Sequence, residues 1–209
     1  MSAKVLLVNG SPHARGCTFT ALSEIAEELG RQGVDSEIVQ VRPDTSGCRA
    51  CRACKSTGRC VIDDQVNEIG DRMDEFDGLV LGSPVYYAGP SGQICAFADR
   101  LFYSHGSRMA LKPAAAVVSC RRAGSTVSLD RLNKYFMICQ MPVVASQYWN
   151  MVHGNTPDEV RRDEEGLQTM RILARNMAWL IKCQQAGDAA GVPRPEREPP
   201  KQTNFIRGD

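Results

Sequence analysis

The sequence lacks the features that mark several common classes of protein. Its 209 residues carry a formal net charge of +1, which gives no basic field to attract nucleic acid or an anionic membrane. Its longest apolar runs fall well short of the roughly 20 residues that span a bilayer. The segment "MSAKVLLVNGSPH" has neither the basic leader nor the cleavage site of a secretion signal. Together these absences predict a cytoplasmic protein without nucleic-acid or membrane partners.

Cysteine, by contrast, is abundant. Nine cysteines without a secretion signal indicate a reducing compartment, and the odd number argues against a complete disulfide framework. Four of them lie close together in "GCRACRACKSTGRC" (47–60), at the spacing C-x₂-C-x₂-C-x₅-C: Cys48, Cys51, Cys54 and Cys60. The other five lie mostly in apolar settings and are expected to fill the core or loops.

Short apolar segments alternate with helical patterns along most of the chain. Strands are predicted at 4–10, 36–41, 78–87, 113–119 and 141–148. Helices are predicted at about 18–32, 66–76, 91–104, 128–139 and 167–183. A further helix start is predicted at Thr156 and Pro157, a capping residue followed by proline. The alternation predicts an α/β fold, a doubly wound parallel sheet with helices on both faces.

Residues 1–187 are expected to form one domain, because no repeat or low-complexity linker divides them. Residues 188–209 are rich in proline and charge and are predicted to form a tail that wraps over the surface or frays. In a doubly wound sheet, ligands bind beyond the carboxyl ends of the strands, where the strand order reverses. The site is therefore expected in the loops that follow residues 10, 83, 119 and 148.

The loop after the first strand, "NGSPHARGCTFTAL" (9–22), combines glycines and hydroxyl residues with the start of a helix. Free backbone amides and the positive end of a helix favour a bound anion. The loop lacks the Gly-Lys-Ser/Thr of a Walker A loop and the three glycines of a dinucleotide fingerprint, so a single phosphomonoester fits it best. The alternative is an ordinary turn in which Thr18 caps the helix and His13 is solvated.

The loop after the third strand lies within "GSPVYYAGPSGQICAFADR" (82–100). Pro84, Gly89 and Pro90 stiffen it, and Tyr86 and Tyr87 offer aromatic faces at the edge of the sheet. A rigid loop with exposed amides and aromatic rings favours a planar heteroaromatic ligand. The alternative, that both tyrosines pack in the core, agrees less well with the turn residues around them.

These two loops together resemble those of the flavodoxin-like NAD(P)H-dependent FMN reductases. The shared features are "GSP" followed by "GCT", and "GSPVYYAGPSGQ…F-DR", within a resemblance that covers roughly residues 3 to 183. The resemblance implies a three-layer flavodoxin-like sandwich, a five-stranded sheet in the order 2-1-3-4-5, and FMN as cofactor. The residues implied to contact FMN are Ser11, His13, Gly16, Cys17 and Thr18 at the phosphate, Pro84, Val85, Tyr86 and Tyr87 at the isoalloxazine and ribityl, and Ser119, Arg121 and Gly124 after the fourth strand. Cys17 stands where asparagine is common and His13 where arginine is common, which removes one charged partner of the phosphate.

The cysteine segment (residues 47–60) resembles that of the iron–sulfur flavoproteins, a branch of the same group. Thiolates at two-residue intervals also hold [4Fe–4S] clusters in ferredoxins, although the last gap differs here and Val61 follows in place of proline. A structural zinc site usually has two C-x₂-C pairs a dozen or more residues apart, which this segment lacks. Three alternatives remain open for Cys48, Cys51, Cys54 and Cys60: a [4Fe–4S] cluster, reduced thiols or a thiol redox pair, and zinc.

The resemblance implies an NAD(P)H-dependent FMN oxidoreductase that passes electrons from a nicotinamide through FMN to a small acceptor, with no side-chain acid or base required. A second hypothesis is an iron–sulfur flavoprotein that relays electrons from a ferredoxin-like donor through a cluster to FMN. A third is a non-catalytic flavin-binding module. Because this family commonly completes each flavin site across a dimer, a homodimer or tetramer is expected, and Trp149 is a candidate lid over the flavin.

Overall fold

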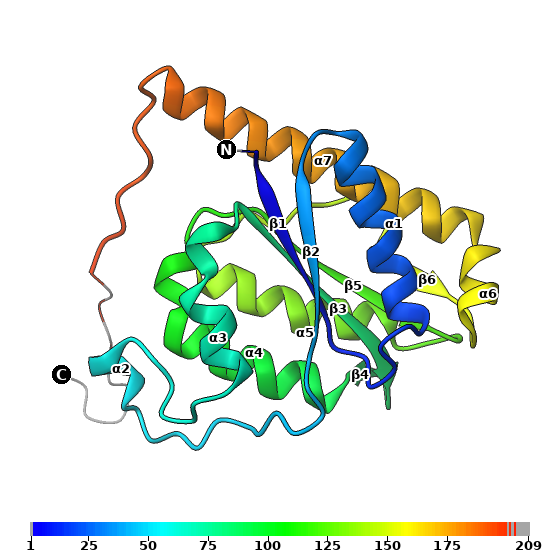
Figure 1. Cartoon of the computed structure of the whole chain (residues 1–209), viewed down its shortest axis with the longest axis horizontal. Coiled ribbons are helices and arrows are strands. Elements are labelled where there is room, and N and C mark those ends of the chain that lie inside the picture. Colours follow the sequence, from blue (N-terminus) through cyan, green and yellow to red (C-terminus); the bar gives the residue numbers. More distant parts are fainter. Residues whose placement is uncertain (1, 200, 202, 204–209) are drawn as a thin grey trace.

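A parallel sheet with helices on both faces forms the centre of the molecule (Figure 1). The computed structural model describes residues 2–199, 201 and 203. The parallel strands lie side by side in the order β2 (Asp35–Gln40), β1 (Lys4–Asn9), β3 (Gly78–Tyr86), β5 (Ala114–Cys120) and β6 (Met151–His153). The two-residue strand β4 (Gly89–Pro90) pairs with β3 and runs antiparallel to it. Counted along the chain without β4, the strand order is the predicted 2-1-3-4-5, which confirms the doubly wound α/β class.

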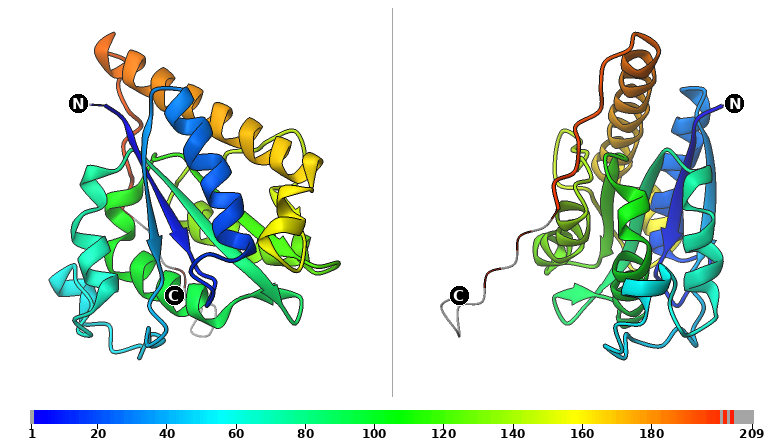
Figure 2. Two further views of the ribbon diagram at one scale, coloured as in Figure 1. Left: turned by 45° about the vertical axis from the view of Figure 1, so that its right-hand side comes forward. Right: turned by 90° about the vertical axis from the view of Figure 1, so that its left-hand side faces the viewer.

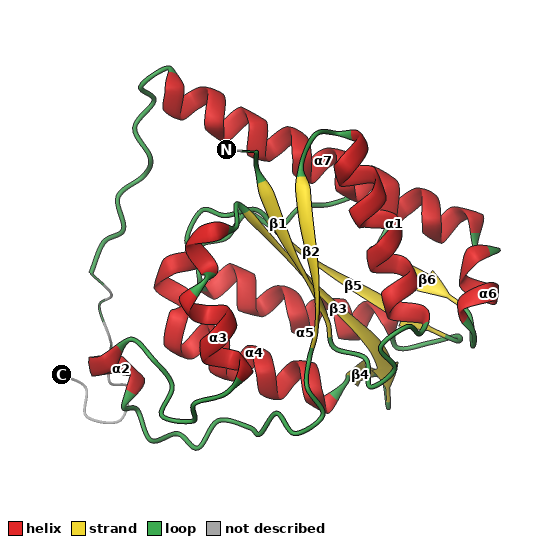
Figure 3. Ribbon diagram, in the orientation of Figure 1, coloured by secondary structure: helices red, strands yellow, loops and turns green. Residues whose placement is uncertain are grey.

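Two helical layers cover the sheet and explain why its strands are apolar on both sides (Figures 2 and 3). One layer contains α1 (Cys17–Arg31), α6 (Pro157–Arg161) and α7 (Glu164–Ala189), and the other contains α3 (Gln65–Asp71), α4 (Gly92–His105) and α5 (Ser125–Ile138). Along β1, Val5 and Leu7 pack toward the first layer, Leu6 and Val8 pack toward the second, and all four are fully buried. Successive side chains of a strand point to opposite faces, so burial of both faces requires a continuous apolar run.

The predicted helices are present, with boundaries that differ by a few residues. The helix predicted at 66–76 ends at Asp71 and continues after one residue as the 3₁₀ turn η1 (Met73–Glu75), and a second 3₁₀ turn, η2 (Gly106–Met109), follows α4. The Thr156 hydroxyl accepts from the N–H of Glu159 at 3.2 Å, so it caps α6 as predicted. Among the described helices, none combines the length and the apolar character needed to cross a membrane.

The fifth parallel strand is displaced from its predicted position. The sequence predicts a strand at 141–148, whereas the structure pairs Val143 alone with Ala114 and then forms β6 at Met151–His153. Ala114 of β5 pairs with Val143, and Val118 of β5 pairs with Met151. Between these two pairings β5 advances by four residues, whereas the neighbouring segment advances by eight. The prediction was wrong for residues 144–148, which belong to a loop and not to a strand.

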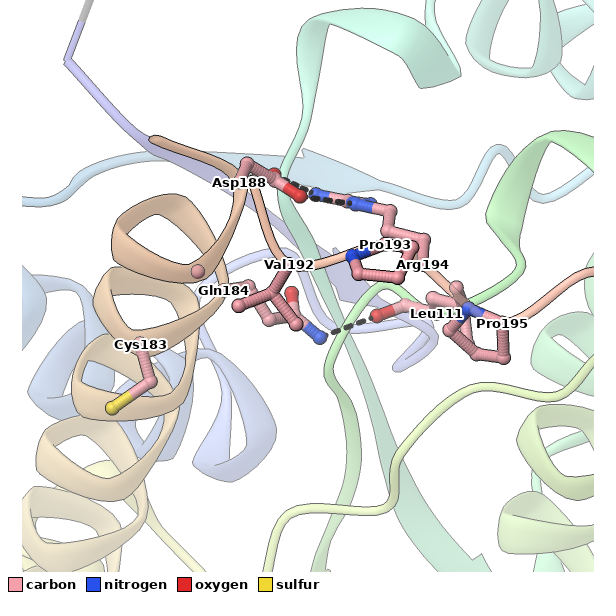
Figure 4. Close-up of a pocket in the computed structure, with 9 residues that line it drawn as sticks. Leu111, Cys183, Gln184, Asp188, Val192, Pro193, Arg194 and Pro195 are labelled. Atoms are coloured by element: carbon pink, nitrogen blue, oxygen red, sulfur yellow. Dashed lines mark hydrogen bonds and ion pairs between the residues drawn. The ribbon is translucent and has the colours of Figure 1, made fainter. Parts of the chain in front are cut away.

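The first part of the C-terminal tail folds back over the end of α7 (Figure 4). Helix α7 ends at Ala189, so its last two residues belong to the predicted tail. Arg194 forms an ion pair with Asp188 at 2.5 Å, and Leu111 lies opposite them across a cavity at the amino-terminal edge of the sheet. This part of the tail wraps over the surface; residues 200, 202 and 204–209 of the predicted tail lie outside the described residues.

Candidate functional site

Buried polar side chains hold the loop between β1 and α1 in shape. Asn9, the last residue of β1, accepts a hydrogen bond from the N–H of Ser11 at 3.1 Å and donates to the carbonyl of Ala14 at 3.3 Å. Gln40, the last residue of β2, accepts from the Asn9 amide at 2.7 Å and donates to the Ser11 carbonyl at 2.6 Å. The Ser11 hydroxyl accepts from the N–H of His13 at 3.1 Å. The loop thus keeps its shape without using the amides at the start of α1.

Two of the helices longer than a single turn begin at this edge of the sheet without a side-chain cap. The caps of α3, α4, α6 and α7 are Asp64, Ser91, Thr156 and Asp163. Helices α1 and α5 instead follow Gly16 and Gly124, and within the described residues no side chain accepts from their first amides. Neither helix has an acidic residue in its first turn. Free amides at the positive end of a helix are an anion-binding arrangement, which supports a phosphate site at the start of α1.

Thr18 and Ser119 join the loops that follow β1 and β5. Their hydroxyl oxygens lie 2.9 Å apart, and both residues are almost fully buried. The Thr18 hydroxyl is therefore engaged with the neighbouring loop, and its backbone amide remains for a ligand. The Cys17 thiol lies 3.6 Å from the carbonyl oxygen of Gly154, and burial raises the pKa of this thiol. Cys17 is therefore a neutral side chain that contacts the segment following β6.

The loop after β3 is a hairpin with an exposed tip. Pro84 and Val85 are half-buried at its base, while Tyr86 is 43% exposed and Tyr87 is fully exposed. Tyr87 and Ala88, the two tip residues, have φ angles of 49° and 57°. Two successive positive φ angles are the pattern of a type I′ turn, which favours asparagine and glycine, so tyrosine and alanine are strained there. Tyr86 and Tyr87 do not pack in the core, and their rings are accessible to a ligand or to a second molecule.

The three predicted loops form one continuous rim (residues 10–18, 84–91 and 119–124). A Cβ at Gly124, where φ is 87°, would lie only 2.6 Å from the Cα of Ala88 and 3.0 Å from the Cγ1 of Val85. On the other side of the hairpin, the Ser91 hydroxyl donates to the Gly10 carbonyl at 2.5 Å. The hairpin is thus fixed between the loop after β1 and the loop after β5.

Positive charge at the rim comes from residues at the surface. His13 and Arg121, both predicted to contact the cofactor, are exposed. Arg15, which the sequence analysis did not single out, is also exposed, and its guanidinium carbon lies 5.6 Å from the centroid of the Phe19 ring. Because Arg15 directly precedes Gly16, it offers a guanidinium cation beside the amides at the start of α1.

Trp149 lies in the loop that interrupts the fifth strand. Its side chain is 56% exposed and meets Tyr148 edge-on, with ring centroids 4.5 Å apart. Both rings border a groove that also contains Leu129 and Asn133 of α5. The role of Trp149 as a lid over the flavin stays a prediction.

The cysteine segment runs along the carboxyl edge of the sheet to the single helical turn α2 (Cys54–Thr57) (Figure 1). Its four thiols border one hollow against α4: Cys48, Cys51, Cys54 and Cys60. Burial, and then the three neighbouring thiols, raise the pKa of the Cys54 thiol. A bound cation would reverse this effect, because a coordinating thiol is deprotonated.

The donor set of the segment, four cysteine thiols, is one that both structural zinc sites and [4Fe–4S] clusters use. Within the described residues, no three side chains of cysteine, histidine, aspartate or glutamate are grouped so that they could hold one metal ion. Tetrahedral zinc needs all its sulfur ligands at about 2.3 Å from one centre. In a [4Fe–4S] cluster, each thiolate binds a different iron, so the four sulfurs need not converge on one metal centre.

A fully buried arginine lies beneath the cysteine segment. The Nε of Arg100, on α4, donates to the Sγ of Cys60 at 3.3 Å, and its two Nη atoms donate to the carboxylate of Asp64 at 2.6 and 2.8 Å. Asn67 binds both the N–H and the carbonyl of Cys60, at 3.0 and 2.9 Å. Burial raises the pKa of Asp64, but hydrogen bonds from Arg100 and a backbone N–H outweigh it, so the pKa is lowered. Cys60 is thus held by side chains from both α3 and α4.

Several polar residues that position the two regions were not predicted from the sequence. These residues are the buried Asn9, Asn67 and Arg100 and the half-buried Gln40 and Asp64. Asn9 ends an apolar strand and Arg100 ends the motif F-x-D-R, so each carries a visible signal. The partners, however, lie far apart along the chain, 36 residues in the case of Arg100 and Asp64, and one sequence does not show such pairs.

Comparison with known proteins agrees with this geometry. A family profile described as "NADPH-dependent FMN reductase" matches residues 3–156. An iron–sulfur flavoprotein of Methanocaldococcus jannaschii is 31% identical over 188 residues, which are 86% of this chain and 97% of the relative. An iron–sulfur flavoprotein of Methanosarcina thermophila is 28% identical over 189 residues, 87% of this chain and 97% of the relative. A flavodoxin, WrbA-like protein of Agrobacterium tumefaciens superposes with a TM-score of 0.61 over 88% of this chain and 99% of its own, at 15% identity, which confirms the flavodoxin-like fold.

Proposed function

The chain belongs to the NADPH-dependent FMN reductase family, in its iron–sulfur flavoprotein branch, and from this premise we propose that it transfers electrons between a [4Fe–4S] cluster and FMN. The family supports an FMN-binding oxidoreductase, with FMN on the rim. The observation that carries the electron path is the common hollow bordered by the four thiols, at the same edge of the sheet as the rim. A ferredoxin-like protein is the proposed donor and a small molecule the acceptor.

The rim residues have separate tasks in this proposal. The first amides of α1, together with Ser11 and Arg15, bind the phosphate, because this helix start is free of side-chain caps and acidic residues. Pro84, Val85 and Gly124 support the ring system from the hairpin and from the start of α5. When bound, FMN accepts electrons in pairs or singly, which suits it to link different donors. The protein binds and orients the cofactor, and no side chain is assigned a proton-transfer step.

Direct reduction by NAD(P)H is the second candidate function. It is favoured by the family description, which names NADPH as the reductant. It also agrees with the exposed Tyr86 and Tyr87 rings, which leave room for a planar nicotinamide near the flavin. In this case the cysteine segment is not required for turnover, and a quinone or other small molecule accepts the electrons.

We further propose a homodimer or tetramer in the cytoplasm. The tip of the hairpin, with Tyr87 fully exposed and strained, is suited to contact a second copy. No disulfide joins any of the nine cysteines, all of which lie within the described residues, and unpaired cysteines persist in a reducing compartment. Sedimentation of the FMN-loaded protein tests the oligomeric state.

Anaerobic purification tests the electron path. We expect about four irons and four sulfides per chain beside bound FMN, as a [4Fe–4S] cluster requires. A reduced ferredoxin should then bleach the flavin band of this protein, and NADH and NADPH are compared with it. Flavin reduction by nicotinamide in protein without iron would support the second candidate. A protein that binds FMN but accepts electrons from none of these donors would be the non-catalytic module.

A further inference from the structure

We propose that Arg100 sets the reduction potential of the cluster, by donating a hydrogen bond to the Cys60 thiolate and by placing a positive charge beside it. The inference rests on the proposed cluster and assigns a role to a residue outside the cysteine motif. Arg100 acts through Cys60, so it is a positioning residue. The effect is expected on the cluster alone, since the guanidinium contacts the cysteine segment and Asp64.

The first observation is complete burial of a charged side chain. The Arg100 side chain is 0% exposed, whereas most of the other buried residues of α4 are apolar, such as Phe97 and Leu101. Arginine is almost never fully buried without a partner, and a buried ion pair is often no more stable than well-packed apolar residues. Stability of the fold therefore does not explain why an arginine occupies this position.

The second observation is the direction of the guanidinium. Its Nη atoms donate to oxygen: the Asp64 carboxylate, the Ile62 carbonyl at 2.9 Å and the Ser46 carbonyl at 3.4 Å. These contacts come from both ends of the cysteine segment and fix the plane of the fork. The remaining donor, Nε, points at the sulfur of Cys60 at 3.3 Å. Four hydrogen bonds to oxygen thus hold the guanidinium in place. In this position its Nε donates a hydrogen bond to the Cys60 sulfur.

Reduction of a cluster adds one negative charge next to the fully buried guanidinium of Arg100. Hydrogen bonds to the ligand sulfurs and nearby positive charge favour the more negative state, so both raise the reduction potential. The carboxylate of Asp64 acts in the opposite direction, because it compensates the charge of Arg100. Neutralising Arg100 must therefore lower the potential, and neutralising Asp64 must raise it. Loosening of the segment alone would not produce shifts of opposite sign.

The test compares Arg100→Gln, Arg100→Lys and Asp64→Asn with the wild-type protein, each with its cluster and FMN. Asparagine is also a good N-cap, so Asp64→Asn keeps the start of α3. Anaerobic redox titration, followed by the absorbance and the electron paramagnetic resonance signal of the cluster, gives the potentials. We expect Arg100→Gln to make reduction at least tenfold less favourable, which corresponds to about 59 mV for one electron. Asp64→Asn should shift the potential upward, and Arg100→Lys, which keeps the charge but loses the fork, should lie between Arg100→Gln and the wild type.

The matched control is Arg171→Gln, which removes an arginine paired with Glu24 in the opposite helical layer. Its cluster potential should equal that of the wild type. Equal potentials in all variants, or shifts of the same sign in Arg100→Gln and Asp64→Asn, would overturn the inference while leaving the cluster in place. The Arg100 variants could fold and bind FMN but fail to hold iron. In that case Asp64→Asn decides the test: an upward shift of the cluster potential supports the inference, and an unchanged potential overturns it. Wild-type protein that binds FMN but no iron or sulfide after anaerobic reconstitution overturns the proposed cluster and this inference together.

Discussion

The rim and the cysteine segment lie at the same edge of the sheet but are built in different ways. The rim consists of strand ends and helix starts, and a few buried hydrogen bonds such as Thr18 to Ser119 lock its loops together. The cysteine segment contains one helical turn and is mostly exposed, and side chains from α3 and α4 hold it from below. The rim is therefore a product of the fold, whereas the cysteine segment depends on its side chains and on what they bind.

The largest expected effect follows because the cysteine segment and the rim are built independently of each other. Cys51→Ser should abolish cluster assembly, because a hydroxyl is a poor ligand for iron, and it should leave FMN affinity unchanged because Cys51 lies outside the rim. Cys51 is exposed, so serine causes no loss of packing. Iron and sulfide analysis and flavin fluorescence titration of the anaerobic protein measure the two outcomes. Cys183→Ser, at an exposed cysteine on α7, is the control and should retain both groups.

Loss of FMN together with iron in Cys51→Ser would break the comparison. It would mean that the segment supports the rim, and that the two regions form one cooperative unit. The observed contacts of the segment are with α3 and α4, which makes this the less favoured outcome.

The sheet was largely predictable because strands buried on both faces leave continuous apolar runs in the sequence. The fifth strand was not, although 141–148 contains the same kind of residues. There the Ser146 hydroxyl binds the side chain of Asn150 at 2.7 Å and the carbonyl of Tyr148 at 2.6 Å, which favours a turn over strand pairing. Local side-chain hydrogen bonds of this kind compete with the sheet, and hydrophobic pattern does not report them.

The candidate site, like the sheet, was predictable where its sequence signals are local. Glycines, hydroxyls and clustered cysteines are local signals, so both regions were found from the sequence. The start of α5 at Ser125, three residues before its predicted start, depends on Gly124 and its contact with the hairpin. The pair of Arg100 and Asp64 depends on long-range packing. The pairing of two such residues across a long stretch of chain leaves no local pattern in the sequence.

A second, smaller effect is expected at the junction within the rim. Gly124→Ala places a Cβ 2.6 Å from the Cα of Ala88 and puts alanine in a left-handed conformation. Overpacking and left-handed strain together should lower the free energy of unfolding by about 2–4 kcal/mol. Because the hairpin must move, FMN should bind at least about tenfold more weakly, which corresponds to roughly 1.4 kcal/mol. Denaturant unfolding and flavin titration measure both quantities.

Gly92→Ala is the matched control for this change. Gly92 is the first residue of α4, close to the hairpin in sequence, and no heavy atom lies within 4 Å of its added Cβ. This variant should keep both its stability and its FMN affinity. Equal behaviour of the two glycine variants would show that the hairpin adjusts freely, and the rim would then be as pliable as the cysteine segment.

The smallest expected effect concerns the hydrogen bond between Thr18 and Ser119. Thr18→Val leaves the buried Ser119 hydroxyl without its partner, which should lower the free energy of unfolding by about 1–3 kcal/mol. The double variant Thr18→Val with Ser119→Ala removes both polar groups and should recover most of this loss, as a denaturant double-mutant cycle measures. FMN affinity should change little, because the helix amides and not the Thr18 hydroxyl are assigned to the phosphate. The opposite result would be a large loss of FMN affinity in Thr18→Val, with no coupling between Thr18 and Ser119 in the free energy of unfolding. The Thr18 hydroxyl would then bind the phosphate, and the rim, like the cysteine segment, would depend on its side chains.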